Sequence, residues 1–183
     1  MRLLKQTWVA VAVAAMILAV APASHAQLNS NTATVNLNAV MAESLSVSAA
    51  PGTVNFNLPA SGIAPGSAPV VITTAWVLSP ARTKVSVYAF LGSVAAALTD
   101  GAGNNIASAK VSGSVNGGAM GPFTGASPFS GATAITVVNA LAITNANRNA
   151  NRVDNVGLQI DTTGLGLPSG VYTGIMTVQA QAI

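Results

Sequence analysis

The fold of this chain is decided by residues 70–91, which read VVITTAWVLSPARTKVSVYAFL. Residues 70–78 are all apolar or Thr, which is typical of a strand buried near the centre of a sheet. The sequence Ser79-Pro80-Ala81-Arg82 predicts a turn. Residues 84–91 then alternate between inward apolar and outward positions, so we expect this stretch to return as a strand that pairs with the first.

Alternation with period two recurs on both sides of this segment, and helical periodicity is absent from residues 27–183. Turn signals separate the alternating stretches, among them Pro51-Gly52, Asp100-Gly101, an Asn-rich run at 145–151 and a Gly-rich run at 163–170. The further strands that we expect are residues 34–41, 45–49, 53–58, 94–98, 106–115, 134–143, 153–160 and 171–182. Gly174, inside the last of them, predicts a bulge or a close approach of another backbone.

This pattern predicts an all-β protein, an antiparallel β-sandwich of the immunoglobulin-like or jelly-roll-like type, with a sheet closed into a barrel as the second choice. Residues 27–183 are long enough to form a single domain with its own core. Trp76 lies within an apolar run and is expected in that core. Because the chain has no cysteine, we expect burial and sheet hydrogen bonds to stabilise it without disulfides.

Residues 1–26 have the three parts of a cleavable secretory signal peptide. Arg2 and Lys5 form a basic start, residues 8–21 (WVAVAVAAMILAVA) form an uncharged apolar run, and Ser24-His25-Ala26 places small residues before a cut at Gln27. A membrane-spanning helix needs ~20 apolar residues, so this shorter run predicts a cleaved signal helix rather than an anchor. We therefore expect export to the periplasm, the cell surface or the medium, with no membrane span after cleavage.

Removal of the signal changes the charge balance of the protein. Cleavage takes away two of the seven basic residues and the only histidine, and leaves five cations, four acids and a net charge of about +1. Five dispersed cations and few aromatic residues exclude a nucleic-acid partner. A weakly charged surface rich in Thr, Asn and Ser favours a protein that packs against copies of itself or against other surface proteins.

Residues 27–183 contain neither His nor Cys, the groups used in Ser-His-Asp and Cys-His catalysis and in imidazole or thiolate metal sites. Of the four acids, Asp100 and Asp154 are expected in turns and Asp161 at the end of a strand. Residues 100–105 (DGAGNN) offer one carboxylate and two amides, too few oxygens for a calcium site. We therefore predict that the protein is not an enzyme and has no catalytic residue, metal site or cofactor.

Two pairs of residues are candidates for a contact surface. Phe123 and Phe129 lie within residues 117–131, a stretch rich in Gly, Pro, Ser and Thr that we expect to form a long surface loop. These rings are either exposed or tucked back over the edge of the sandwich. Arg148 and Arg152 are interspersed with four Asn residues and either grip a carboxylate or a sugar or mark an exposed hairpin tip, which is the favoured alternative.

The two ends of the exported region read TATVNLNAVMAESLSVSAAPGTVNFNLP (residues 32–59) and GVYTGIMTVQAQAI (residues 170–183). Together they resemble the secreted spore-coat-U and pilin-like β-sandwich modules, which begin with alternating strands and end in Gly-x-Tyr-x-Gly/Asp followed by alternating Thr and Val. The chain departs from those modules at Ser44, near which they usually have a disulfide, and at Ile183, where they usually end on an aromatic residue. The positions that carry the resemblance are Val35, Leu37, Leu45, Val47, Phe56, Gly170, Tyr172 and Thr177.

The resemblance implies a fimbrial or surface-structure subunit, in which an N-terminal strand of one copy completes the sheet of a neighbour. Residues 28–41 have the alternation that such a strand needs, as does any first strand of a sheet. We therefore expect an exported, non-enzymatic structural or adhesive surface protein, a self-associating subunit of the fimbrial type. The alternative is a secreted module that binds carbohydrate or cell wall, with a glycan as its partner.

Overall fold

The computed structural model describes residues 28–183, and the predicted signal peptide with its helix lies outside the described residues. The chain divides into two units, which meet in the sequence at Ala39 and Val40. Residues 28–39 contain no helix or strand, and their side chains are exposed. The strand expected at residues 34–41 is therefore absent, because alternation gives a strand only where another strand pairs with the backbone.

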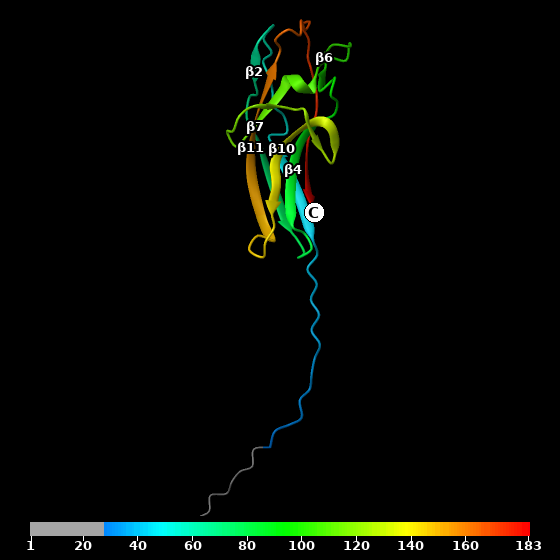
Figure 1. Ribbon diagram of the computed structural model, residues 1–183, viewed down its shortest axis with the longest axis vertical. Helices are drawn as coiled ribbons and strands as arrows, with labels where there is room; N and C mark the ends of the chain where they lie inside the picture. Colours follow the sequence, from blue (N-terminus) through cyan, green and yellow to red (C-terminus); the bar gives the residue numbers. More distant parts are fainter. Residues whose placement is uncertain (1–27) are drawn as a thin grey trace, which may run out of the picture. The chain divides into compact units, whose positions relative to one another are not determined.

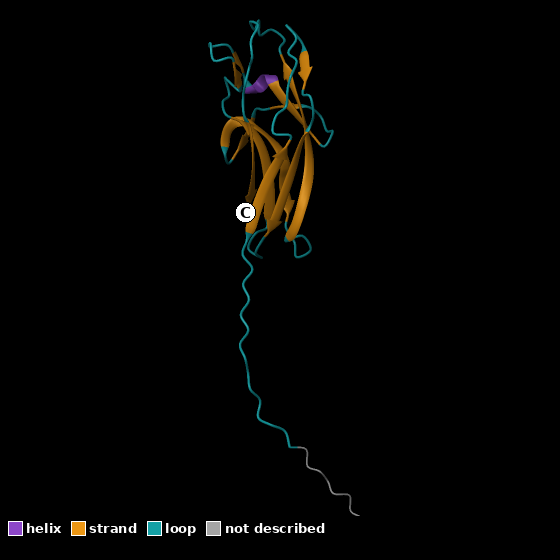
Figure 2. Ribbon diagram, turned by 180° about the vertical axis from the view of Figure 1, so that it is seen from behind, coloured by secondary structure: helices purple, strands orange, loops and turns teal. Residues whose placement is uncertain are grey.

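Two antiparallel sheets pack face to face as a β-sandwich in the unit Val40–Ile183, which confirms the predicted fold class (Figure 1). The first sheet runs in the order β1 (Ser44–Ala50), β3 (Val70–Val77), β11 (Asn149–Asp161), β7 (Val111–Val115) and β8 (Gly121–Pro122), and β2 (Ile63–Pro65) also pairs with β11. The second sheet runs in the order β12 (Met176–Ala182), β4 (Lys84–Leu91), β10 (Ser130–Ala142) and β9 (Gly125–Ser127). A short ladder joins β5 (Leu98–Thr99) to β6 (Asn105–Ile106), and a single 3₁₀ turn, η1 (Ser108–Lys110), is the only helical element within residues 28–183 (Figure 2).

The core lies between the two sheets and is built from alternate residues of their strands. The even-numbered residues of β3, including Ile72 and Trp76, are buried, and so are the odd-numbered residues of β4. The indole Nε1 of Trp76 donates a hydrogen bond to the backbone oxygen of Asn147 at 2.8 Å, so its one polar group is paired. Trp76 is thus a core residue, as the sequence predicted.

The strands β3 and β4 lie where residues 70–91 predict them, but they do not pair with each other. β3 pairs with β1 and β11, whereas β4 pairs with β10 and β12. The turn at Ser79–Arg82 therefore carries the chain from one sheet to the other, and the expected hairpin is wrong. Each strand lies inside its own sheet and turns its buried face toward the other sheet, which is the general way in which two sheets bury their apolar faces.

The remaining predicted strands agree in part with the structure. Residues 134–143 and 153–160 overlap the longer strands β10 and β11, and residues 45–49 lie within β1. The strand expected at 106–115 is divided into β6, η1 and β7, and the strand expected at 94–98 is reduced to the short β5.

Two predicted strands contain irregular chain, residues 53–58 throughout and residues 171–175 of the last strand, and both irregular stretches line the same hollow of the sandwich. Residues 53–58 have only an isolated bridge, between Phe56 and Gly66, and the strand expected at 171–182 becomes regular only at Met176. Gly174 marks a close backbone approach, as predicted, because a Cβ atom there would collide with the carbonyl oxygen of Ala97. The residues before β12 are therefore held against the chain near β5, where Thr173 bridges Thr99.

Candidate functional site

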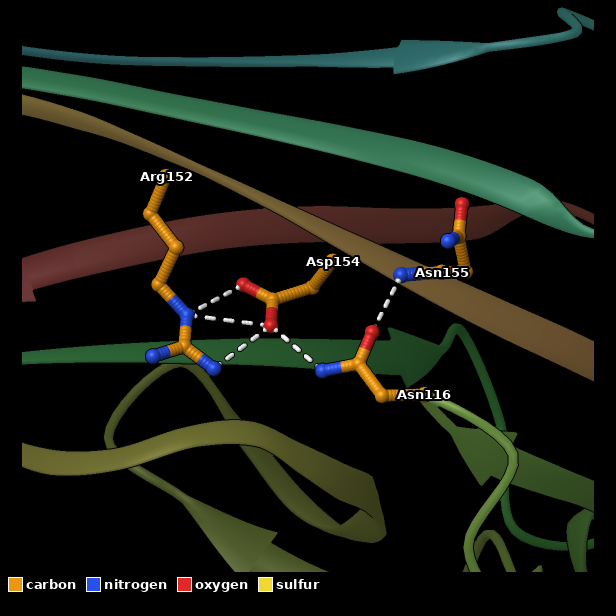
Figure 3. Close-up of polar contacts among 4 residues, drawn as sticks. All are labelled: Asn116, Arg152, Asp154 and Asn155. Atoms are coloured by element: carbon orange, nitrogen blue, oxygen red, sulfur yellow. Dashed lines mark hydrogen bonds and ion pairs between the residues drawn. The ribbon is translucent and has the colours of Figure 1, made fainter.

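Arg148 and Arg152, the second pair of candidates for a contact surface, bind different partners within the protein. Arg148 lies in the turn before β11, where its Nη1 donates to the backbone oxygen of Ser79 at 2.7 Å and of Arg82 at 3.3 Å. Arg152 lies on β11 and points between the sheets toward Asp154 (Figure 3). Each guanidinium is therefore engaged by the fold itself, and the two do not form a common ligand site.

Asp154 is a buried carboxylate held by Arg152 and Asn116 (Figure 3). Nε and Nη2 of Arg152 both donate to it, and Nδ2 of Asn116 donates to its Oδ1 at 2.7 Å. The side-chain oxygen of Asn116 accepts a hydrogen bond from the backbone nitrogen of Asn155 at 2.8 Å. This network fastens the loop after β7 to β11, so the expected position of Asp154 in a turn is wrong and its role is internal.

The protonation of Asp154 is set by two opposing effects. Burial favours the neutral acid and would raise the pKa, but the hydrogen bonds from Arg152 and Asn116 outweigh burial and lower the pKa of the Asp154 carboxyl. The same pairing raises the pKa of Arg152. Both groups are therefore charged at neutral pH, as a stable ion pair requires.

The two phenylalanines predicted as a contact surface have different environments. Phe123 is fully buried, directly beside Gly113, where an added Cβ atom would lie 3.2 Å from the ring. Phe129 is half-buried on the outer face of the second sheet, where its ring centroid lies 6.1 Å from that of Tyr88 and 6.3 Å from that of Phe90. Phe123 is thus a core residue and not a surface contact, because the segment 121–127 forms β8 and β9 instead of an open loop.

The other three acids each accept a hydrogen bond within the fold. Asp100 and Asp161 have the predicted positions in a turn and at the end of β11. Hydrogen bonds from Ser79, Asn104 and Thr163 lower the pKa of Glu43, Asp100 and Asp161, respectively. In the part of the chain that the structure describes, no three His, Cys, Asp or Glu side chains gather into a group that could hold a metal ion.

A groove opens on the side of the sandwich where β1 and β12 are neighbours. Within residues 28–183, β1 pairs only with β3 and β12 only with β4, and the two edge strands lie side by side without a ladder between them. Irregular chain extends the two walls of the groove, with residues 51–60 on one side and 167–175 on the other. The strands β1 and β12 thus each leave one edge without a ladder, to which an added strand could pair.

Most of the side chains that line the groove are apolar. The floor of the groove consists of two adjoining hollows of about 390 and 730 Å³, which share Thr53, Val54, Phe56 and Gly174 in their linings. No charged side chain lines either hollow. The floor also includes Val47, Leu58, Val70, Leu98, Leu158, Ile160, Leu167 and Val178. Such a groove is suited to an extended, uncharged segment with apolar side chains at alternate positions.

Sequence reasoning missed this groove because it assigned both irregular walls to strands. The signals that could have revealed it are Pro51 and Pro59, which bound one wall and cannot donate to a ladder, and Gly170 and Gly174 in the other wall. The exposure of Val171 and Ile175, which are 79% and 77% exposed, is a second sign that this wall has no covering element among the described residues.

The fold and the groove define a class of protein, an all-β antiparallel sandwich with an open, uncharged groove between its edge strands. Comparisons with protein-family models, with curated proteins and with solved structures found no match for this chain. Among residues 28–183, no helix is both long and apolar enough to cross a membrane.

Proposed function

We propose that this protein is an exported, non-enzymatic structural subunit of a cell surface, whose copies associate when residues 28–41 of one copy enter the groove of another. One observation carries the proposal. The groove is lined mainly by apolar side chains, has no charged side chain and lies beside the unpaired edges of β1 and β12, and residues 28–41 are an exposed, uncharged and alternating segment.

The dimensions of the two parts agree. An extended strand rises about 3.3 Å per residue, so residues 28–41 reach about as far as either wall, residues 47–59 or 167–178, when these are extended. Val35, Leu37 and Met41 are 80%, 93% and 78% exposed and share one face of the extended segment. They would meet the groove floor, while Thr34, Asn36, Asn38 and Val40 would lie on the opposite face.

Strand addition would contribute both apolar burial and backbone hydrogen bonds. Full burial of a Val, Leu or Met side chain is worth about 1.5–3 kcal/mol, so three such residues supply several kcal/mol. The added strand would also pair with the free edge of β1 or of β12, which otherwise is a site of uncontrolled edge association.

The export and non-enzymatic parts of the proposal rest on separate observations. The pattern of residues 1–26 supports export. All four acids of the exported region are hydrogen-bonded within the fold, so none of them is a carboxylate presented to a substrate. The sparse charge also reduces repulsion between copies packed side by side.

Disulfide trapping tests the proposed contact directly, because the natural chain contains no cysteine. Variants with a single cysteine, Val35→Cys, Leu37→Cys or Ala39→Cys, are each mixed with Met176→Cys, whose position lines the groove. A disulfide forms only where the two Cα atoms approach to within about 7 Å. We expect one of these mixtures to give a linked pair of copies in high yield.

The matched control is Thr136→Cys, which places the same thiol on the exposed outer face of β10. It should give little linked product with any of the three partners. Equal yields with Thr136→Cys and Met176→Cys would contradict the proposal. So would a chain without residues 28–41 that associates as strongly as the full chain in sedimentation velocity.

A further inference from the structure

The outer face of the first sheet has a shallow hollow that lies apart from the groove between β1 and β12. The hollow has a volume of about 330 Å³, and its outward-facing residues come from β1, β3 and β11. The strand register places them in two adjacent rows, Ser44–Val77–Asn149 and Ser46–Ala75–Asn151. The small apolar residues of β3 thus form a floor between hydroxyls on one side and amides on the other.

The amides on β11 have no evident role in folding. Asn is depleted in strands, yet Asn149 and Asn151 occupy successive outward positions of β11 and are exposed. Within residues 28–183 their side chains have no hydrogen-bond partner, and Ser46 Oγ makes only a long contact of 3.4 Å with the oxygen of Ala75. A residue type that is disfavoured in a strand and makes no stabilising contact there is expected at a functional site.

The chemistry of the hollow selects its ligand. Asn amides and Ser hydroxyls both donate and accept hydrogen bonds, as do the hydroxyls of a sugar. Ala75 and Val77 offer an apolar floor for the carbon–hydrogen face of a sugar ring. The rows are free of charged side chains, so nothing there would pair with a carboxylate or a sulfate.

We propose that this hollow, formed by Ser44, Ser46, Ala75, Val77, Asn149 and Asn151, binds a neutral polysaccharide. The ligand lies along β3, with its ring faces on Ala75 and Val77 and its hydroxyls bonded to Asn149 and Asn151. The width of the site supports this placement, because β1 and β11 are separated by two strand spacings, about 9.6 Å. A second copy of the protein fits the face less well, since Ser and Ala are depleted in protein–protein interfaces.

The test is a titration of the ¹⁵N-labelled protein with cellohexaose, maltohexaose and chitohexaose, observed by nuclear magnetic resonance. We expect at least one of these neutral hexasaccharides to shift the side-chain amide signals of Asn149 and Asn151. The double variant Asn149→Ala/Asn151→Ala should bind that sugar about tenfold or more weakly, because each lost hydrogen bond is worth about 1 kcal/mol. Asn155→Ala, a matched change on the same face of β11 beyond the hollow, should bind it as the natural protein does.

Four outcomes would overturn the inference. They are the absence of any shift with the three sugars, equal binding by the double variant, stronger binding of an acidic hexagalacturonate, and shifts of Asn149 and Asn151 that depend on protein concentration alone. The last result would show that a second copy covers the face. Because Asn149 and Asn151 lie outside the groove between β1 and β12, these results are independent of the proposed strand addition.

Discussion

The guanidinium of Arg152 forms an ion pair with the buried carboxylate of Asp154, with Nη2 lying 2.7 Å from Oδ1. The two residues lie two positions apart on β11 and both face the interior. The side chain of Asp154 is 1% exposed and that of Arg152 is 39% exposed. Removing one partner of such a pair costs more stability than the pair itself contributes, because the other charge stays behind without compensation.

Asp154→Ala should therefore destabilise the protein by about 2–4 kcal/mol, since it leaves the guanidinium of Arg152 and the amide of Asn116 without their acceptor. Denaturation by urea, followed by intrinsic fluorescence, measures the change. Asp161→Ala is the control, because Asp161 forms an exposed ion pair with Lys110 at 3.6 Å. Its effect on the free energy of unfolding should be much smaller. A comparable loss of stability in the two variants would show that the buried network stabilises the protein no more than an exposed ion pair does.

The contribution of Asp154 should also depend on pH. The pKa of this carboxyl is lower in the folded protein than in the unfolded chain. Its stabilisation is thus fully present above the ordinary Asp range and is lost as the pH falls through the folded-state pKa. Unfolding free energies of the natural protein and of Asp154→Asn should differ most near pH 7 and converge toward pH 2. A difference that stays constant over this range would contradict the assigned ion pair.

Asn116→Asp should show the opposite dependence on pH. The left-handed backbone of Asn116, with φ of 51°, also accommodates Asp, so the change keeps the local fold. It places a second carboxylate 2.7 Å from the first, where the amide stood. Two carboxylates at this distance cannot both ionise freely, so the pKa of one of them is raised. The variant should be destabilised at pH 7 and regain stability as the pH falls, whereas Asn116→Ala should not regain it.

The sequence predicts the strands of this fold better than their pairing. Residues 70–78 and 84–91 could be recognised because burial on a strand leaves a pattern within the segment itself. Whether the turn at Ser79–Arg82 closes a hairpin or crosses between sheets depends on partners far away in the chain, such as β10 and β12. A local pattern contains no information on that choice.

The same limit explains which site residues were missed. Asp154 is surrounded by Asn and Arg residues that are typical of a turn, and its burial follows only from the pairing of β11 with β3 and β7. The groove is a consequence of two segments that alternate like strands and have no strand beside them. The charge-free segment 28–41 and the absence of His and Cys from residues 27–183, in contrast, could be read directly from the residues.

Phe123 and Phe129 allow a final prediction. The sequence assigns both rings to the same candidate contact surface, whereas the structure buries Phe123 in the core and leaves Phe129 half-buried on the outer face of a sheet. Phe123 is 0% exposed and packs in the core beside Gly113, so Phe123→Ala creates a cavity and should cost about 3–5 kcal/mol. Phe129 is half-buried and makes only edge and offset contacts with Tyr88 and Phe90. Since an aromatic pair adds about 0.5–1.5 kcal/mol, Phe129→Ala should cost clearly less. Thermal unfolding of both variants by circular dichroism provides the comparison. If the two variants lost the same stability, the segment 121–129 would pack more loosely than the structure indicates, and both rings would again be candidates for a surface contact.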